Sequence, residues 1–210
     1  VQKPYCMASA GDKKVHGVGN YILEVRDRKN KNLKTLLYFL DSGRRPRWKG
    51  LGEYDWFDFT QVEWYREMSK YYSAVNKNKP YPALAFFHIP LIEYAMMSAD
   101  ENSFIGSRKE TECTGALNPG MFAAMREMGD IMGTFCGHDH DNDYIGGYNG
   151  IYLAYGRYSG GNTVYNNLGK NGCRIIELKE GKREFTTYIR LLGGDKLYDV
   201  KYPKTFKLNN

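Results

Sequence analysis

The sequence lacks the features that mark membrane proteins, exported precursors and cysteine-based frameworks. No window of about 18 consecutive apolar residues occurs in the 210-residue chain, so we expect no transmembrane helix and no membrane partner. The opening segment VQKPYCMASAGDKK has no apolar core after a basic start, so it does not have the pattern of a signal peptide. The four cysteines form no C-x-x-C pair, which disfavours a zinc knuckle or a thioredoxin-type site.

The composition is that of an ordinary folded domain with a moderate positive charge. Hydrophobic residues make up 42% of the chain and charged residues 26%, both close to globular averages. We therefore expect a single domain over residues 1–210. The formal net charge of +6 fits either a solvated basic surface or an attraction to anions such as phosphate esters or nucleic acid.

Apolar patterning predicts strands and helices that alternate through the middle of the chain, and strands that dominate its end. The predicted strands are 19–25, 35–40, 83–87, 131–136, 144–155, 173–178 and 184–189, and the predicted helices are 60–75, 90–97 and 119–128. The basic segment 26–34 between the first two strands is expected to be a hairpin loop. This order of elements predicts an α/β fold built as a layered sandwich.

The first predicted helix has a start signal and a core face. Thr60 has the residue type of an N-cap, and Glu63 lies where it would complete a capping box. Four apolar residues recur at helical spacing and are expected to face the core, namely Trp64, Met68, Tyr71 and Val75.

Three of the four histidines follow directly after apolar strands. His88 comes after strand 83–87, and His138 and His140 come after strand 131–136. The carboxyl ends of strands in an α/β sheet are where sites are built, and imidazole is the commonest neutral ligand of transition metals. On an extended backbone both rings of H-x-H would face one cavity, whereas a turn would aim them at two neighbouring ions. The sequence therefore predicts His88, His138 and His140 as metal ligands.

Arg157 stands in a glycine-rich strand end and is the predicted substrate contact. A guanidinium suits a phosphate group because it donates two parallel hydrogen bonds. A surface or structural role for this arginine stays open. The aspartates around the histidines, Asp139, Asp141 and Asp143, are expected to be turn residues or to orient the metal ligands.

Two short motifs give these histidines a family context. Phe87-His88-Ile89-Pro90 and Gly137-His138-Asp139-His140 resemble the fourth and fifth sequence blocks of the calcineurin-like metallophosphoesterases, which include the purple acid phosphatases. Further stretches resemble a branch of purple acid phosphatase-like proteins from plants, fungi and bacteria, namely YFLDSG at 38–43, QVEW at 61–64, NPGMF at 118–122, NDY at 142–144 and YGR at 155–157. The resemblance covers roughly residues 17–192.

The resemblance implies a mixed sheet in a layered α-β-β-α sandwich and a site with two metal ions, Fe, Zn or Mn. By the same resemblance, His88 and His138 would bind one ion and His140 the other. The implied reaction is hydrolysis of phosphate monoesters by a metal-activated hydroxide. A periplasmic or extracellular location is also implied by the family.

The chain departs from the family in one respect that bears on activity. The upstream blocks G-D-x-H, G-D-x-x-D and G-N-H-[DE] are absent, and Gly11-Asp12 has the wrong spacing to His16 to replace the first of them. We therefore interpret residues 1–210 as the C-terminal part of a metallophosphoesterase domain, with a missing N-terminal segment of the same protein as its partner. We assign no catalytic acid or base within the chain, and we expect it to be inactive alone.

Rival hydrolase families are disfavoured by residues, whereas two functional alternatives stay open. A metallo-β-lactamase would need a further histidine after His140, an amidohydrolase needs more histidines downstream, and a cytidine deaminase needs H-x-E with P-C-x-x-C. The open alternatives are a phosphodiesterase or nuclease of the same fold and a non-catalytic binding module that retains the fold. Nucleic acid as a partner has no support from an aromatic-basic RNA-binding signature.

Overall fold

The computed structural model of the protein describes residues 3–161 and 164–207. The helices are α1 (Phe59–Val75), α2 (Ile92–Ser98) and α3 (Met121–Met128). The strands are β1 (Tyr21–Arg26), β2 (Leu33–Phe39), β3 (Ala83–Phe86), β4 (Phe104–Ile105), β5 (Ile131–Cys136), β6 (Ile145–Tyr148), β7 (Ile151–Tyr155), β8 (Gly172–Leu178), β9 (Phe185–Leu191) and β10 (Lys196–Tyr202). Within those residues, no helix combines the length and the apolar character needed to cross a bilayer.

The strands form one large mixed sheet and one small antiparallel sheet. The large sheet has seven strands in the order β1-β2-β3-β5-β7-β6-β4, and the small one has the order β10-β9-β8. Strands β2, β3, β5 and β7 run parallel, and antiparallel strands flank them on both sides. The predicted α/β class with a mixed sheet is therefore confirmed.

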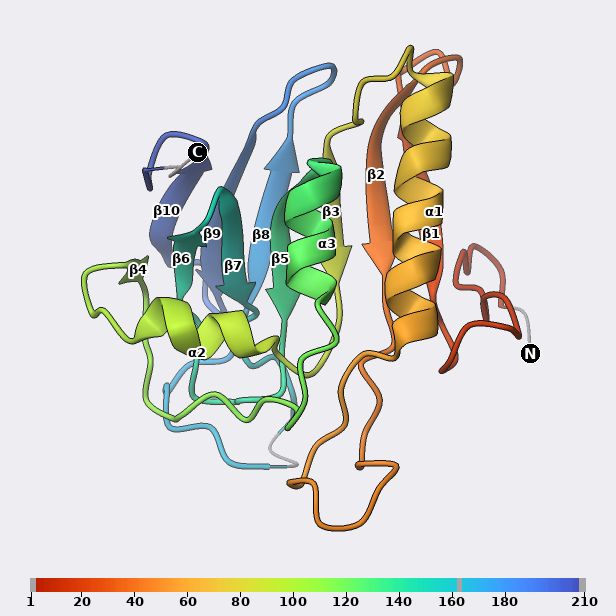
Figure 1. Ribbon diagram of the computed structural model, residues 1–210. Helices are drawn as coiled ribbons and strands as arrows, with labels where there is room; N and C mark the ends of the chain where they lie inside the picture. The colour runs from red at the N-terminus through yellow and green to blue at the C-terminus, as the bar shows by residue number, and fades with distance from the viewer. Residues whose placement is uncertain (1–2, 162–163, 208–210) are drawn as a thin grey trace.

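The two faces of the large sheet have different covers (Figure 1). The three helices pack on one face, where Leu36, Tyr65 and Met125 belong to the larger core cluster. The small sheet packs on the other face over β5 and β7, where Phe185 and Tyr202 meet Tyr152. The result is a helix layer, a sheet and a second partial sheet, which is the layering that the element order predicts.

A row of aromatic side chains crosses the face opposite the helices. Tyr21, Phe39, Phe86 and Phe135 are register partners on β1, β2, β3 and β5, and their rings stack with centroids 4.8, 5.2 and 5.3 Å apart. Phe135 is buried by the small sheet, whereas the other three rings are half-buried. The small sheet therefore leaves the β1–β3 end of this row partly open.

Helix α1 begins earlier than the sequence predicts and buries a different face. Asp58 is the N-cap and Gln61 completes the capping box. The prediction of Thr60 with Glu63 is therefore wrong by two residues. The buried residues are Gln61, Tyr65 and Ser69, and the hydroxyl of Tyr65 donates to the buried carboxylate of Asp130.

The expected apolar face of α1 is only partly confirmed. Trp64 and Met68 are half-buried against the core, but Tyr71 and Val75 are 59% and 57% exposed. The buried side of the helix instead carries Gln61 and Tyr65, which form hydrogen bonds with Asn20 and Asp130. Apolar spacing in the sequence does not indicate such polar contacts.

The other predicted elements hold with shifted ends. The hairpin loop between β1 and β2 is present, and the segment predicted as strand 144–155 is a hairpin of β6 and β7. Helices α2 and α3 begin about two residues after the prolines predicted to open them. Two strands were not predicted from the sequence, the two-residue β4 and the edge strand β10.

Candidate metal centre

Parallel strands bring two of the predicted histidines to one edge of the sheet. Strands β3 and β5 are neighbours, and their pairing continues past the strand ends. Phe87 N donates to Phe135 O, and Gly137 N donates to the carbonyl of His88, both at 3.1 Å. His88 therefore lies beside the Gly137-His138 turn because the register of the sheet places it there.

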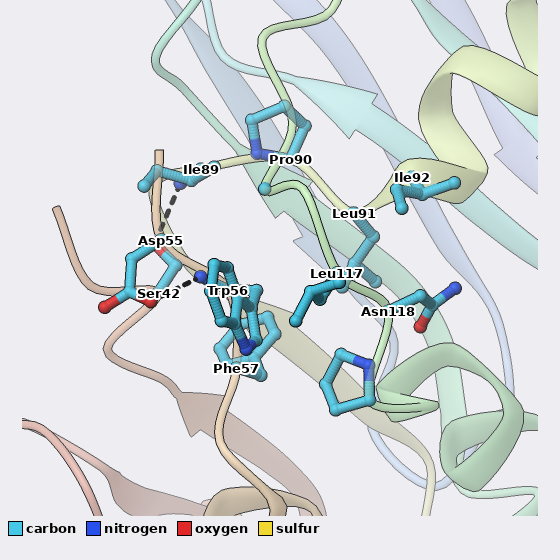
Figure 2. A pocket seen from close by; sticks show the side chains of 12 residues that line it. Ser42, Asp55, Trp56, Phe57, Ile89, Pro90, Leu91, Ile92, Leu117 and Asn118 are labelled. Carbon is cyan, nitrogen blue, oxygen red and sulfur yellow. Dashed lines mark hydrogen bonds between the residues drawn. The ribbon is translucent and has the colours of Figure 1, made fainter. Parts of the chain in front are cut away.

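A serine three residues after the end of strand β2 accepts hydrogen bonds from the turn that carries His88. The backbone N–H groups of His88 and Ile89 donate to Ser42 Oγ at 3.2 and 2.8 Å, and Figure 2 shows Ser42 beside Ile89. The pocket drawn there has a volume of about 20 Å³, room for about one water molecule. Its lining includes Ser42 and Ile89 but none of the three histidines.

The rings of His88 and His138 converge in the way that two ligands of one ion would. His88 Nε2 and His138 Nδ1 are 3.2 Å apart. Two imidazole nitrogens at about 2.0–2.1 Å from one metal ion, at tetrahedral or octahedral angles, are separated by about 2.8–3.4 Å. The spacing of these two nitrogen atoms therefore fits a shared cation, and without metal it also fits a direct hydrogen bond between the two rings.

The surroundings of the two rings favour neutral imidazole. Burial, and then the charges of His88 and His140, lower the pKa of His138 to about 4. Burial, and then the charge of His140, also lower the pKa of His88. Metal ions bind the neutral form, so these two side chains would lose no proton on binding a metal ion near neutral pH.

His138 has an unusual backbone and an unpaired ring nitrogen. Its φ is +79°, a left-handed conformation that costs a residue other than glycine about 1–2 kcal/mol. Its Nε2 atom is buried without a hydrogen-bond partner among the described residues. Strain of this kind concentrates at functional sites.

His140 does not join this pair. Its Nδ1 lies 3.2 Å from the carbonyl oxygen of Tyr165, and its ring packs against the rings of Tyr158 and Tyr165. In the described part of the chain, no three His, Cys, Asp or Glu side chains are arranged to hold a metal ion. The structure thus brings together two of the three predicted ligands, and the ligand role of all three stays a prediction.

The three aspartates that alternate with the histidines hold the loop in place. Asp139 accepts the hydroxyl of Tyr155 at 2.6 Å and the N–H of Cys113. Asp141 accepts the backbone and side-chain N–H groups of Asn167, both at 2.6 Å. These two carboxylates accept hydrogen bonds from Tyr155, Cys113 and Asn167, and none of those donors is an imidazole. This favours the turn role over the ligand-orienting role.

Arg157 is buried next to the loop that carries these aspartates. Its guanidinium forms an ion pair with Asp143 at 2.7 Å, with side chains only 4% and 0% exposed. It also donates to the carbonyl oxygens of Leu168 and Lys170. These contacts fit the structural role that the sequence left open for Arg157, and the substrate contact stays a prediction.

A loop that no motif marks also reaches the histidines. Tyr54, in the irregular segment 43–57, packs edge to face with the ring of His138, with centroids 4.3 Å apart. The guanidinium of Arg45 lies 5.9 Å from the centre of the same tyrosine ring. The only sequence signal was the concentration of aromatic and basic residues, which does not say where they point.

Comparison with curated proteins identifies relatives of one kind, although no protein-family model matches the chain. It is 33% identical to "Probable inactive purple acid phosphatase 14" of Arabidopsis thaliana over 84% of the chain, and 36% identical to "Probable inactive purple acid phosphatase 29" of the same plant over 80%. It is also 31% identical over 86% of its length to "Phosphatase DCR2" of Saccharomyces cerevisiae. The chain belongs to the purple acid phosphatase-like branch of the calcineurin-like metallophosphoesterases.

The chain spans about half the length of the plant relatives that it matches. The chain spans 46% of each of the two plant proteins and 32% of the yeast protein. Among solved structures, a dimetal phosphatase from Danio rerio has a TM-score of 0.52 at 13% identity, covering 87% of this chain and 60% of that one. This likeness supports the metallophosphoesterase fold, and two metal ions are a property of that zebrafish protein.

Proposed function

We propose that this chain supplies the histidine side of a metal centre in a metal-dependent phosphoric ester hydrolase that acts on phosphate monoesters. The observation that carries the proposal is the approach of His88 Nε2 to His138 Nδ1 at 3.2 Å. The left-handed backbone of His138 supports it, because glycine would adopt this conformation with less strain and the chain has a histidine there instead. Strain of this kind is usually kept for a function of the side chain. The yeast relative, which is named as a phosphatase, supports the hydrolase class.

The donor set fits one ion in part. His88 and His138 would hold it through Nε2 and Nδ1, and Fe, Zn and Mn all accept imidazole nitrogen. His140 would serve a second ion through Nε2, because Tyr165 occupies its Nδ1. When bound, such ions polarise a phosphoryl group and lower the pKa of a water molecule. The contribution of this chain is to hold neutral imidazoles at a fixed spacing.

The remaining ligands would come from a polypeptide segment with the upstream motifs of the family. Two imidazoles leave the other positions of the first ion open. The half-buried aromatic row of Tyr21, Phe39 and Phe86 supports such a partner, because it continues the surface on which the small sheet already packs. Apolar area left open beside an existing sheet contact is where a further sheet would extend that contact.

A non-catalytic binding module is the second candidate. It is favoured by the lack of a third converging ligand in the described residues, and several relatives carry the word inactive in their names. The two candidates differ in whether the histidine pair binds a metal ion at all.

The test is metal binding by single-histidine variants. We expect Zn²⁺ titration by calorimetry to show binding that is lost in His88→Ala and in His138→Gly, and retained in His140→Ala. His138→Gly is informative because it removes the imidazole and also relieves the left-handed backbone. Its thermal stability should therefore equal or exceed that of the wild type, which separates ligand loss from unfolding.

Catalysis is tested separately from metal binding. We expect the 210-residue chain to leave p-nitrophenyl phosphate unhydrolysed with added Mn²⁺ or Fe and Zn, because two imidazoles do not complete the site. The full site should turn over when a segment carrying the upstream motifs is joined to the chain. Zn²⁺ binding that is unaffected by His88→Ala and His138→Gly would contradict the metal centre and favour the binding module.

A further inference from the structure

The segment 43–57 packs against the candidate metal centre through one aromatic ring. The rings of Tyr54 and His138 are nearly perpendicular, with an interplanar angle of 87° and centroids 4.3 Å apart. The Nε2 atom of His138 is buried and has no hydrogen-bond partner among the described residues. A buried ring nitrogen without a partner costs free energy, so another group beside it is expected to compensate.

Two rings lie perpendicular to that of His138, and the ring of Tyr54 is the nearer, with centroids 4.3 Å apart against 5.0 Å for His88. In a perpendicular pair, one ring directs its edge at the face of the other. The separation of 4.3 Å is shorter than the about 4.5–7 Å usual for aromatic pairs. A short separation is expected when the smaller imidazole brings an N–H against the face of the larger ring. The unpaired Nε2–H of His138 would then point at the π-face of Tyr54.

The position of the proton decides which nitrogen of His138 can bind a metal ion. A neutral imidazole has one protonated nitrogen and one with a free lone pair. With hydrogen on Nε2, the lone pair is on Nδ1, which is the atom 3.2 Å from His88 Nε2. Metal-binding histidines usually donate their other N–H to a carboxylate or carbonyl, which fixes the ring and its tautomer. In this protein the face of the Tyr54 ring would replace the carboxylate or carbonyl as the acceptor.

We propose that Tyr54 is a positioning residue whose ring face accepts the Nε2–H of His138 and so holds Nδ1 toward the shared cation. The contact itself stands on ring geometry, and its purpose rests on the proposed metal centre. Tyr54 does not touch substrate in this scheme and acts through His138.

The residues that follow Tyr54 are anchored to the rest of the protein. Asp55 is buried, accepts the N–H of Trp56 at 2.9 Å and lies 3.5 Å from the guanidinium of Arg47. Figure 2 shows Asp55 and Trp56 in the wall of the pocket that Ser42 also lines. A Cβ atom at Gly43 would lie 2.6 Å from the Asp55 side chain, and Gly43 has a φ of +73°. The residue next to Tyr54 therefore packs closely against Gly43, in a contact that only glycine permits.

The proposal is tested with Tyr54→Phe, Tyr54→Leu and a control, Trp48→Leu. Phenylalanine keeps the aromatic face and leucine removes it. Trp48 is 57% exposed on the same loop and has its ring contact with Trp56. With ¹⁵N-labelled histidine and no metal, NMR spectra should show the His138 Nε2–H tautomer and upfield ring-current shifts of its ring protons. These shifts should persist in Tyr54→Phe and Trp48→Leu and be lost in Tyr54→Leu.

A Zn²⁺ titration adds the functional readout. Loss of an outer contact to a ligating histidine typically weakens metal binding about 10–100-fold, so we expect that loss in Tyr54→Leu and unchanged affinity in Tyr54→Phe and Trp48→Leu. Upfield shifts on Tyr54 instead of His138 would mean that the edge and face are reversed, and the proposal would fail. It would also fail if Tyr54→Leu left the His138 spectrum unchanged.

The two arms separate this inference from the proposed function. Ring-current shifts need neither metal nor turnover, so they decide the contact between Tyr54 and His138 on their own. Absence of Zn²⁺ binding in the wild type and all three variants would overturn the metal centre and with it the purpose of the contact.

Discussion

Arg157 shows how a single buried charge organises the loop beside the candidate metal centre. Proteins rarely bury an arginine fully unless it is paired. Here the pair with Asp143 is closed to solvent on both sides, and backbone carbonyl groups take further N–H donors of the guanidinium. Removing one partner of such a pair leaves the other charge buried and uncompensated, which is the expensive outcome.

We predict that Arg157→Ala lowers the free energy of unfolding by about 3–5 kcal/mol, because Asp143 is left as a buried unpaired carboxylate. Urea denaturation followed by circular dichroism measures this change, and the exposed Arg44→Ala is the matched control. Normal stability together with weakened binding of a phosphate ester would contradict the structural role and restore the substrate contact.

The proximity of His88 and His138 could be predicted from sequence, whereas the distance between their rings could not. Both residues follow buried strands, and these strands are neighbours in the sheet. The different surroundings of His140 depend on Tyr158 and Tyr165, which come from a distant loop. Tyr54 was missed for the same reason, because segment 43–57 has no periodicity that fixes the direction of a side chain.

At the scale of elements, α1 shows why helix ends are hard to place from sequence. Thr60 and Asp58 both have N-cap side chains, and only the structure shows that Asp58 accepts the N–H of Thr60 while Gln61 reaches back to the N–H of Asp58. The strands were easier to predict, because apolar runs such as β3 and β5 are buried on both faces. The edge strand β10 alternates charged and apolar residues around a register shift, which hides its pattern.

We predict that Asp58→Ala destabilises the protein by about 1–2 kcal/mol and that Thr60→Ala has a smaller effect, since only Asp58 is the N-cap. Partial burial alone would raise the pKa of Asp58, but hydrogen bonds from Thr60 and Arg47 outweigh it and lower the pKa to about 2. The folded-state pKa is thus below the unfolded value of 3.8. The contribution is therefore complete above that value and lost as the pH falls through about 2.

Thermal unfolding between pH 2 and pH 6 is the measurement for the cap. The wild type should lose its advantage over Asp58→Ala as the pH falls through that range, and the two stabilities should converge at the acid end. An equal or larger loss from Thr60→Ala at pH 6 would restore Thr60 as the N-cap.

At the scale of the whole molecule, the main asymmetry lies on the face of the large sheet opposite the helices. One half carries the small sheet (Figure 1). The other half ends in the half-buried part of the aromatic row. Phe39 and Phe135 are the same residue type in one row of register partners, and they differ in whether a second sheet covers them. Comparing truncations at these two positions therefore measures how much the small sheet contributes to the free energy of unfolding.

We predict that Phe135→Ala costs about 3–5 kcal/mol, the usual range for a buried phenylalanine, and that Phe39→Ala costs less than half as much. The reason is that a half-buried ring loses less apolar area on truncation, at about 25 cal/mol per Å². Urea denaturation of both variants at several protein concentrations makes the comparison. Equal losses at all concentrations would show that the chain covers Phe39 itself, and equal losses only at high concentration would show that a second copy does. Either result would remove the open sheet face as support for a partner that completes the metal centre.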